Sequence, residues 1–160
     1  MNTRNTGRKG NPIIIDEGRI ICKKMGEIMN RSRELRNDSE VHYNCAQGVF
    51  IPFAEKFGLT KEQAAAITAN FGAGMKSGYT CGSITGGLMV LGLYGLDDPG
   101  HVKEFFKRMG EKHNNLVNCK DLLREEVKSP EEKKPHCDDM VYEAVEIAED
   151  MIKRKGINHG

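Results

Sequence analysis

Apolar residues recur along most of the chain at steps of three and four, which is the spacing of one face of an α-helix. Between residues 16 and 36 these positions are Ile21, Met25, Ile28, Met29 and Leu35. We find no alternation of apolar and polar residues of the kind that is typical of a strand. The pattern therefore predicts an all-α fold, a single-domain, bundle-like array of about five to six helices.

Capping residues and glycines set the expected helix boundaries. Thr60 and Gln63 form a capping box, and Asp98 with Pro99 is typical of a helix start. The helices are expected over residues 16–36, 45–57, 60–71, 82–94, 99–117 and 138–155. Pro52 is expected to kink the second helix or to divide it into two short pieces.

The remaining segments are expected to be irregular. Residues 1–15 are predicted to be a flexible N-terminal arm, preceding a helical domain over residues 16–156. Cys119 is expected to begin or precede a short turn, and the charged segment 127–136 to be a loop.

Residues 77–96 contain no Asp, Glu, Lys or Arg. A membrane-spanning helix needs about twenty mainly apolar residues, and this segment reaches that length only by counting hydroxyl residues and glycines. The interpretation that we favour is a core helix without membrane insertion, in which Gly82 and Gly86 let a neighbouring backbone approach closely.

Composition excludes several functions. The chain has 160 residues, 29% of them charged, with a formal net charge of +1. Aromatic residues make up 6% and Trp is absent, so no nucleic-acid partner is expected. The early apolar run, residues 13–15, is too short for a secretory signal, so a cytoplasmic location is expected.

The sequence contains five cysteines, and none forms a C-x-x-C pair. Cys45 follows the N-cap candidate Asn44, while Cys81 and Cys137 also precede predicted helices. A helix N-terminus stabilises a thiolate, and Gly82 would leave the sulfur of Cys81 accessible. The alternative is that these cysteines only fill space in the core, and the spacing leaves both interpretations open.

Two segments, "YNCAQGVFIPFAEKFGL" and "GAGMKSGYTCGSITGGLMVLGLYG", together with the later single cysteines, resemble the family of redox-active proteins abbreviated C-GCAxxG-C-C. The resemblance covers about residues 16–152, and Ser83 stands where its central element usually has Ala. It implies a four-residue site that consists of Cys45, Cys81, Cys119 and Cys137. Cys22 has no place in the family pattern and is expected to be a structural thiol on an apolar helix edge.

Three chemistries suit four soft ligands. The leading hypothesis is an electron-transfer protein in which the four cysteines, with Gly82 beside them, hold an iron–sulfur cluster, most simply [2Fe–2S]. The second is a metal-free thiol–disulfide oxidoreductase with Cys81 as nucleophile. The third is a structural zinc site with four cysteine ligands.

The histidines and the possible partners constrain the function less than the cysteines do. His42 and His136 lie near cysteines in the sequence, and either could reach the same site, although His136 is more simply a surface residue. His101 and His113 are expected to face solvent. The redox partner protein is unknown, and a homodimer is possible but not required by the pattern.

Overall fold

The computed structural model describes the backbone of residues 17–158 and the side chains of residues 26–156. This part of the chain forms seven α-helices and one π-helical turn, and no strand. The elements are α1 (Glu17–Arg36), α2 (Cys45–Lys56), α3 (Lys61–Thr68), η1 (Gly74–Gly78), α4 (Gly82–Leu93), α5 (Pro99–Gly110), α6 (Cys119–Glu126) and α7 (Pro130–Asn158). The all-α prediction is confirmed, whereas the predicted count of five to six helices is too low.

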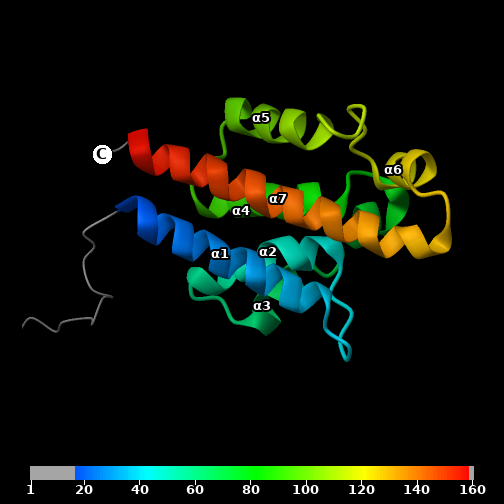
Figure 1. Ribbon diagram of the computed structural model, residues 1–160, viewed down its shortest axis with the longest axis horizontal. Helices are drawn as coiled ribbons and strands as arrows, with labels where there is room; N and C mark the ends of the chain where they lie inside the picture. The colour runs from blue at the N-terminus through cyan, green and yellow to red at the C-terminus, as the bar shows by residue number, and fades with distance from the viewer. Residues whose placement is uncertain (1–16, 159–160) are drawn as a thin grey trace, which may run out of the picture.

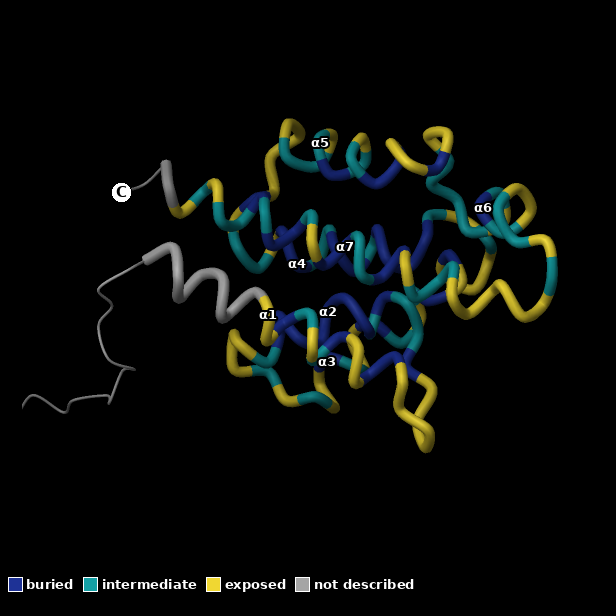
Figure 2. The backbone as a smooth tube through the Cα atoms, in the orientation of Figure 1, coloured by how far each residue is buried: buried dark blue, intermediate teal, exposed yellow. Residues whose placement is uncertain are grey.

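The long helix α7 runs along the molecule beside α1 and packs on α2 and α4 (Figure 1). The contact between α2 and α4 is the most extensive in the molecule. The buried backbone shown in Figure 2 follows α2, α4 and the middle of α7. Fully buried side chains from these helices include Val49, Ile51, Ile84, Leu91, Val141 and Val145. The apolar segment predicted as a core helix is thus α4.

Glycines let α4 approach its neighbours. A Cβ on Gly86 would lie 2.8 Å from the carbonyl oxygen of Ala46, and one on Gly87 would lie 2.2 Å from the ring of Phe105. Contacts below 3.0 Å to backbone leave no room for a side chain. The close helix approach predicted from the glycine spacing is therefore present between α2 and α4.

Helix α2 continues past Pro52 without a break. Proline cannot donate to the carbonyl four residues earlier, which belongs to Gly48. The hydroxyl of Ser32 on α1 donates to this carbonyl instead, with an Oγ–O distance of 2.8 Å. A side chain from the neighbouring helix thus replaces the missing hydrogen bond.

Three predictions for the second half of the chain are wrong, and they concern the end of one helix, a turn and a loop. Helix α5 ends at Gly110 rather than near residue 117, because Asn114 and Asn115 turn the chain with positive φ. The expected turn after Cys119 is the helix α6. The expected loop over residues 127–136 lies largely inside α7.

Helix α7 begins at Pro130, where the local sequence has several features that favour a helix start. The backbone N–H of Glu132 donates to the carbonyl of Ser129, and the Glu132 carboxylate accepts from the N–H of Lys128 at 2.8 Å. Proline at the first position and acidic residues in the first turn both favour this end.

The structure does not reach every prediction. The arm predicted over residues 1–15 and the side chain of Cys22 lie outside the described residues. Within the part described, none of the helices combines the length and the apolar character that crossing a bilayer requires.

Candidate functional site

A cavity of about 490 Å³ lies where α2, α6 and α7 meet the segment between α3 and η1. We call it the cysteine cavity, because Cys45, Cys119 and Cys137 line it. The other side chains and backbone around it are those of Arg36, His42, Asn44, Ala69, Gly72, Ala73, Lys76, Leu123, Pro130, Lys133 and Lys134. Three of the four cysteines predicted as site residues therefore face one space.

Cys45 is the first residue of α2, as the sequence predicted. Asn44 is the N-cap, and its side chain accepts from the N–H of Gln47 at 2.9 Å while the Gln47 side chain accepts from the N–H of Asn44 at 2.8 Å. The Asn44 amide also donates to the carbonyl of Ala69 at 3.2 Å. This capping box holds the Cys45 sulfur at the positive end of the helix.

A short antiparallel contact joins Cys81 and Cys119. The N–H of Cys81 donates to the carbonyl of Val117 at 2.8 Å, and the N–H of Cys119 donates to the carbonyl of Tyr79 at 2.7 Å. These bonds hold the start of α4 beside the start of α6. Gly82 allows α4 to reach α2 as well, since a Cβ there would lie 3.2 Å from the backbone nitrogen of Ala46 and 3.2 Å from the Cβ of Cys45.

Cys137 lies about two turns inside α7, so the prediction that it begins a helix is wrong. Its thiol lies close enough to that of Cys45 for hydrogen bonding between them to shift the pKa of both. The neighbouring Asp138 accepts from Arg36 with an Nε–Oδ1 distance of 2.7 Å, and Arg36 also donates to the carbonyl of Tyr43 at 2.6 Å. Because Arg36 is only 6% exposed, its charge acts on the two thiols with little screening.

The two thiols of this pair ionise differently. The hydrogen bond from Cys137 lowers the pKa of Cys45 to about 7, against the opposing effect of burial and with support from the charge of Arg36. The same hydrogen bond and burial raise the pKa of Cys137. The pair therefore ionises in two steps, and the directions of the two shifts favour the first thiolate on Cys45.

Cys81 does not have the accessible, acidic thiol that its place before a helix predicted. Its residue is 6% exposed, and burial together with the negative charge of Cys45 raises its pKa to about 11. Burial and Cys45 also raise the pKa of Cys119. Burial thus opposes the thiolate of Cys81 in this structure, whereas Cys45 is only partly buried and its pKa is lowered. The catalytic role predicted for Cys81 stays a prediction.

The predicted metal site stays a prediction. The ionisation of Cys45 shifts the pKa values of the three other thiols, so the four sulfurs lie within electrostatic reach of one another. Yet among the described side chains, no three of the types His, Cys, Asp and Glu are grouped as ligands of one metal ion. The arrangement is a pair of thiols, Cys45 and Cys137, with two further thiols nearby.

One histidine, His113, is more buried than the sequence predicted. His113 is 9% exposed, with Nδ1 2.7 Å from Glu126 and Nε2 2.8 Å from Glu143, so the prediction that it faces solvent is wrong. Burial acts to lower the pKa of His113, but these two carboxylates raise it overall. His136 lies against the same Glu126 at 3.4 Å and is not among the residues that line the cysteine cavity.

The positions of His101 and His42 are compatible with the sequence-based predictions. His101 pairs with Asp98 at the start of α5, and its side chain is 41% exposed. His42 does line the cysteine cavity, beside Cys45.

Sequence reasoning missed a left-handed turn at the edge of this cavity. Ala73, Gly74, Met75 and Lys76 have φ values of 51°, 60°, 57° and 54°. Each non-glycine residue in this conformation costs roughly 1–2 kcal/mol, and such strain concentrates at functional sites. Gly72, Gly74 and Gly78 lie close together in the sequence here. Their close spacing was the available signal.

With this geometry described, comparison with known proteins is informative. Residues 43–151 match the family model described as "Putative redox-active protein (C_GCAxxG_C_C)". The match covers more than half of the chain and includes all four site cysteines, so the protein belongs to this family. No curated protein and no solved structure matches the chain.

Proposed function

We propose that the protein carries out thiol–disulfide redox chemistry in which Cys45 and Cys137 alternate between a dithiol and a disulfide. Membership of a family described as redox-active gives the general class. The observation that carries the proposal is the position of Cys45 and Cys137 together in the wall of one solvent-connected cavity, where each thiol shifts the pKa of the other. Neither thiol is fully buried.

The two cysteines have distinct roles in this chemistry. The Cys45 thiolate attacks a disulfide of the partner, forms a mixed disulfide and releases one partner thiolate. Cys137 then loses its proton, attacks the Cys45 sulfur and releases the second partner thiolate. The pair loses two electrons in forming its disulfide, and the partner disulfide gains them. The capping box at Asn44 and the charge of Arg36 favour the thiolate from which the first step begins.

This assignment modifies the sequence-based hypothesis, in which Cys81 was the nucleophile. Cys81 and Cys119 lie near this pair and take no step in the proposed exchange. A role for Cys81 in catalysis stays a prediction, which a Cys81→Ser variant tests directly.

An iron–sulfur cluster is a second candidate, and the observation that favours it is the mutual effect of all four thiols on their pKa values. Cys45, Cys81, Cys119 and Cys137 would hold it, and it would supply one-electron transfer. Zinc with the same ligands is the structural alternative. The donor set suits both chemically, but it requires the sulfurs to close around the metal beyond the arrangement described.

The deciding experiment is a redox titration of protein purified without air, with metal and sulfide analysis on the same sample. All variants carry Cys22→Ala to remove the thiol outside the predicted site. After oxidation we expect a disulfide that joins the peptides containing Cys45 and Cys137, identified by mass spectrometry after proteolysis.

Matched variants separate the possibilities. Cys45→Ser and Cys137→Ser should each abolish this disulfide, whereas Cys119→Ser, in the wall of the same cavity, should leave it intact. Stoichiometric iron and sulfide lost equally in all four single Cys→Ser variants would contradict the dithiol proposal and support the cluster. Stoichiometric zinc without reversible oxidation would support the structural site.

A further inference from the structure

The cysteine cavity is surrounded by positive charge. Arg36 lies at its base, and Lys76, Lys133 and Lys134 lie along its exposed side. Among the described residues that line it, none is Asp or Glu. Asp138, which follows Cys137 in α7, pairs with Arg36 at 2.7 Å and with Lys134 at 2.5 Å, so one carboxylate neutralises part of the charge of two cations.

The two other cations are not neutralised by acidic partners. The Lys76 ammonium donates to the amide oxygen of Asn70 at 2.9 Å, a neutral group. Lys133 makes no ion pair with any of the described side chains. Even when Cys45 is a thiolate, positive charge is in excess around the cavity, and such a wall attracts and orients anions.

The cavity is larger than an inorganic ion requires. Its volume of about 490 Å³ lies within the range of about 300–1,000 Å³ that is typical of pockets for small organic ligands. Leu123, Pro130 and Ala69 add apolar surface to the wall. The cavity is therefore suited to an organic molecule that carries negative groups.

We propose that the substrate of the Cys45–Cys137 pair is a low-molecular-weight anionic disulfide, bound by Lys76, Lys133 and Lys134 with its sulfurs toward Cys45. This inference rests on the proposed function, since it names the partner disulfide of that exchange. The substrate R–S–S–R is reduced to two thiols R–SH, and the two protein thiols become one disulfide. Carboxylates on R contact the lysines and take no part in bond making.

The first test compares two aromatic disulfides, one of which is anionic and the other uncharged. Dithionitrobenzoate carries two carboxylates, and dithiodipyridine is uncharged near neutral pH. Rates are measured in a Cys22→Ala, Cys119→Ser background, which leaves Cys45 as the accessible thiolate. After correction for intrinsic reactivity with a free thiol, we expect the anionic probe to react roughly tenfold faster or more at low salt. This preference should disappear as salt shortens the Debye length from about 30 Å at 0.01 M to about 3 Å at 1 M.

Charge-matched variants locate the effect. The triple variant Lys76→Gln, Lys133→Gln, Lys134→Gln should lose most of the preference, because its rate with dithionitrobenzoate should fall much more than its rate with dithiodipyridine. The control triple variant Lys61→Gln, Lys103→Gln, Lys107→Gln changes the net charge equally on α3 and α5 and should keep the preference. Equal loss in both triple variants, or an equal fall with both probes, would overturn the inference.

A binding measurement separates this inference from the proposed function. S-methylglutathione is anionic but cannot exchange disulfides, and Cys45→Ser protein cannot react. Calorimetry should show binding to this variant that the three cavity Lys→Gln changes remove. Binding without a Cys45–Cys137 disulfide in the redox titration would contradict the proposed function alone. A disulfide without binding or anion preference would contradict the anionic substrate alone.

Discussion

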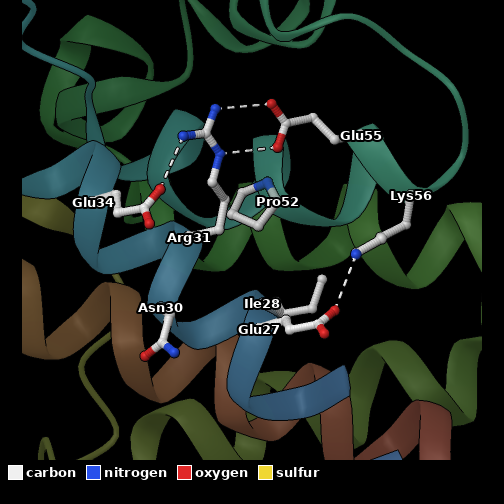
Figure 3. Close-up of a pocket in the computed structure, with 8 residues that line it drawn as sticks. All are labelled: Glu27, Ile28, Asn30, Arg31, Glu34, Pro52, Glu55 and Lys56. Carbon is white, nitrogen blue, oxygen red and sulfur yellow. Dashed lines mark hydrogen bonds and ion pairs between the residues drawn. The ribbon is translucent and has the colours of Figure 1, made fainter. Parts of the chain in front are cut away.

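Two cavities of the same volume, about 490 Å³ each, lie at opposite ends of α2. They differ in how the charged side chains of their walls are paired. The cysteine cavity lies at the first turn, where Cys45 begins the helix. The second, which we call the Arg31 pocket, lies between α1 and the last turns of α2 (Figure 3). Its wall consists of Glu27, Ile28, Asn30, Arg31, Glu34, Pro52, Glu55 and Lys56.

Within the Arg31 pocket the cations face carboxylates. Both oxygens of Glu55 accept from the Arg31 guanidinium at 3.0 Å, Glu34 accepts at 3.1 Å, and Lys56 lies 3.3 Å from Glu27 (Figure 3). The three carboxylates of this wall outnumber its two cations, so no positive charge is in excess for an anionic ligand. The cysteine cavity has more cations than carboxylates and three sulfurs in its wall. Size alone does not distinguish the two cavities, whereas charge pairing and nucleophiles do.

The largest expected effect concerns Arg36, in the wall of the cysteine cavity. Arg36→Ala should lower the free energy of unfolding by about 3–5 kcal/mol, because it leaves Asp138 and the carbonyl of Tyr43 without a buried partner. Urea unfolding measures this loss. A loss below about 1 kcal/mol would show that Lys134 alone satisfies Asp138.

The next effect concerns the helix contact behind the cysteine cavity. Gly86→Ala should cost about 1–3 kcal/mol, because its Cβ would press against the Ala46 carbonyl of α2 and separate α4 from the helix that carries Cys45. Gly92→Ala is the control on the same helix, since no atom lies within 4 Å of its Cβ, and it should stabilise by about 0.5–1 kcal/mol. Thermal unfolding of both variants provides the comparison. Equal shifts of the same sign would contradict the close α2–α4 contact.

The pH dependence of alkylation tests the thiolate itself. The thiolate is the nucleophile and forms as the proton leaves, so the rate at Cys45 should rise with a midpoint near its pKa of about 7. Between about pH 6 and about pH 8 the increase should be roughly tenfold. Cys119, whose pKa burial raises, should still gain reactivity above that range in Cys45→Ser protein. Iodoacetamide labelling with mass spectrometry resolves the two sites, and a Cys45 midpoint above that of Cys119 would reverse our assignment.

The smallest effect is expected in the Arg31 pocket. Arg31→Ala should cost about 0.2–1 kcal/mol, because Arg31 and Glu55 are 35% and 29% exposed and solvent screens their attraction. The reactivity of Cys45 should be unchanged. Parallel urea unfolding and alkylation check both statements, and a changed alkylation rate would mean that the two ends of α2 are coupled.

Local sequence patterns predicted much of the first half of the fold. Asn44, Thr60 and Asp98 cap helices where the sequence indicates them. These features depend on hydrogen bonds within a few residues, which are readable from the sequence alone. The start of α7 carries a comparable signal, Ser129 followed by Pro130 and two glutamates, but its charge and its second proline led to the prediction of a loop.

The chemistry of the site depended on contacts that span the chain. The sequence by itself determined an all-α protein and the helix that begins at Cys45, and its family resemblance indicated four candidate site cysteines. Only the tertiary structure paired Cys45 with Cys137, buried Cys81 and placed Arg36 and the lysines around one cavity. The physical reason is that a helix start is set by its nearest neighbours, whereas a thiol's pKa is set by burial and by charges that folding brings from distant segments.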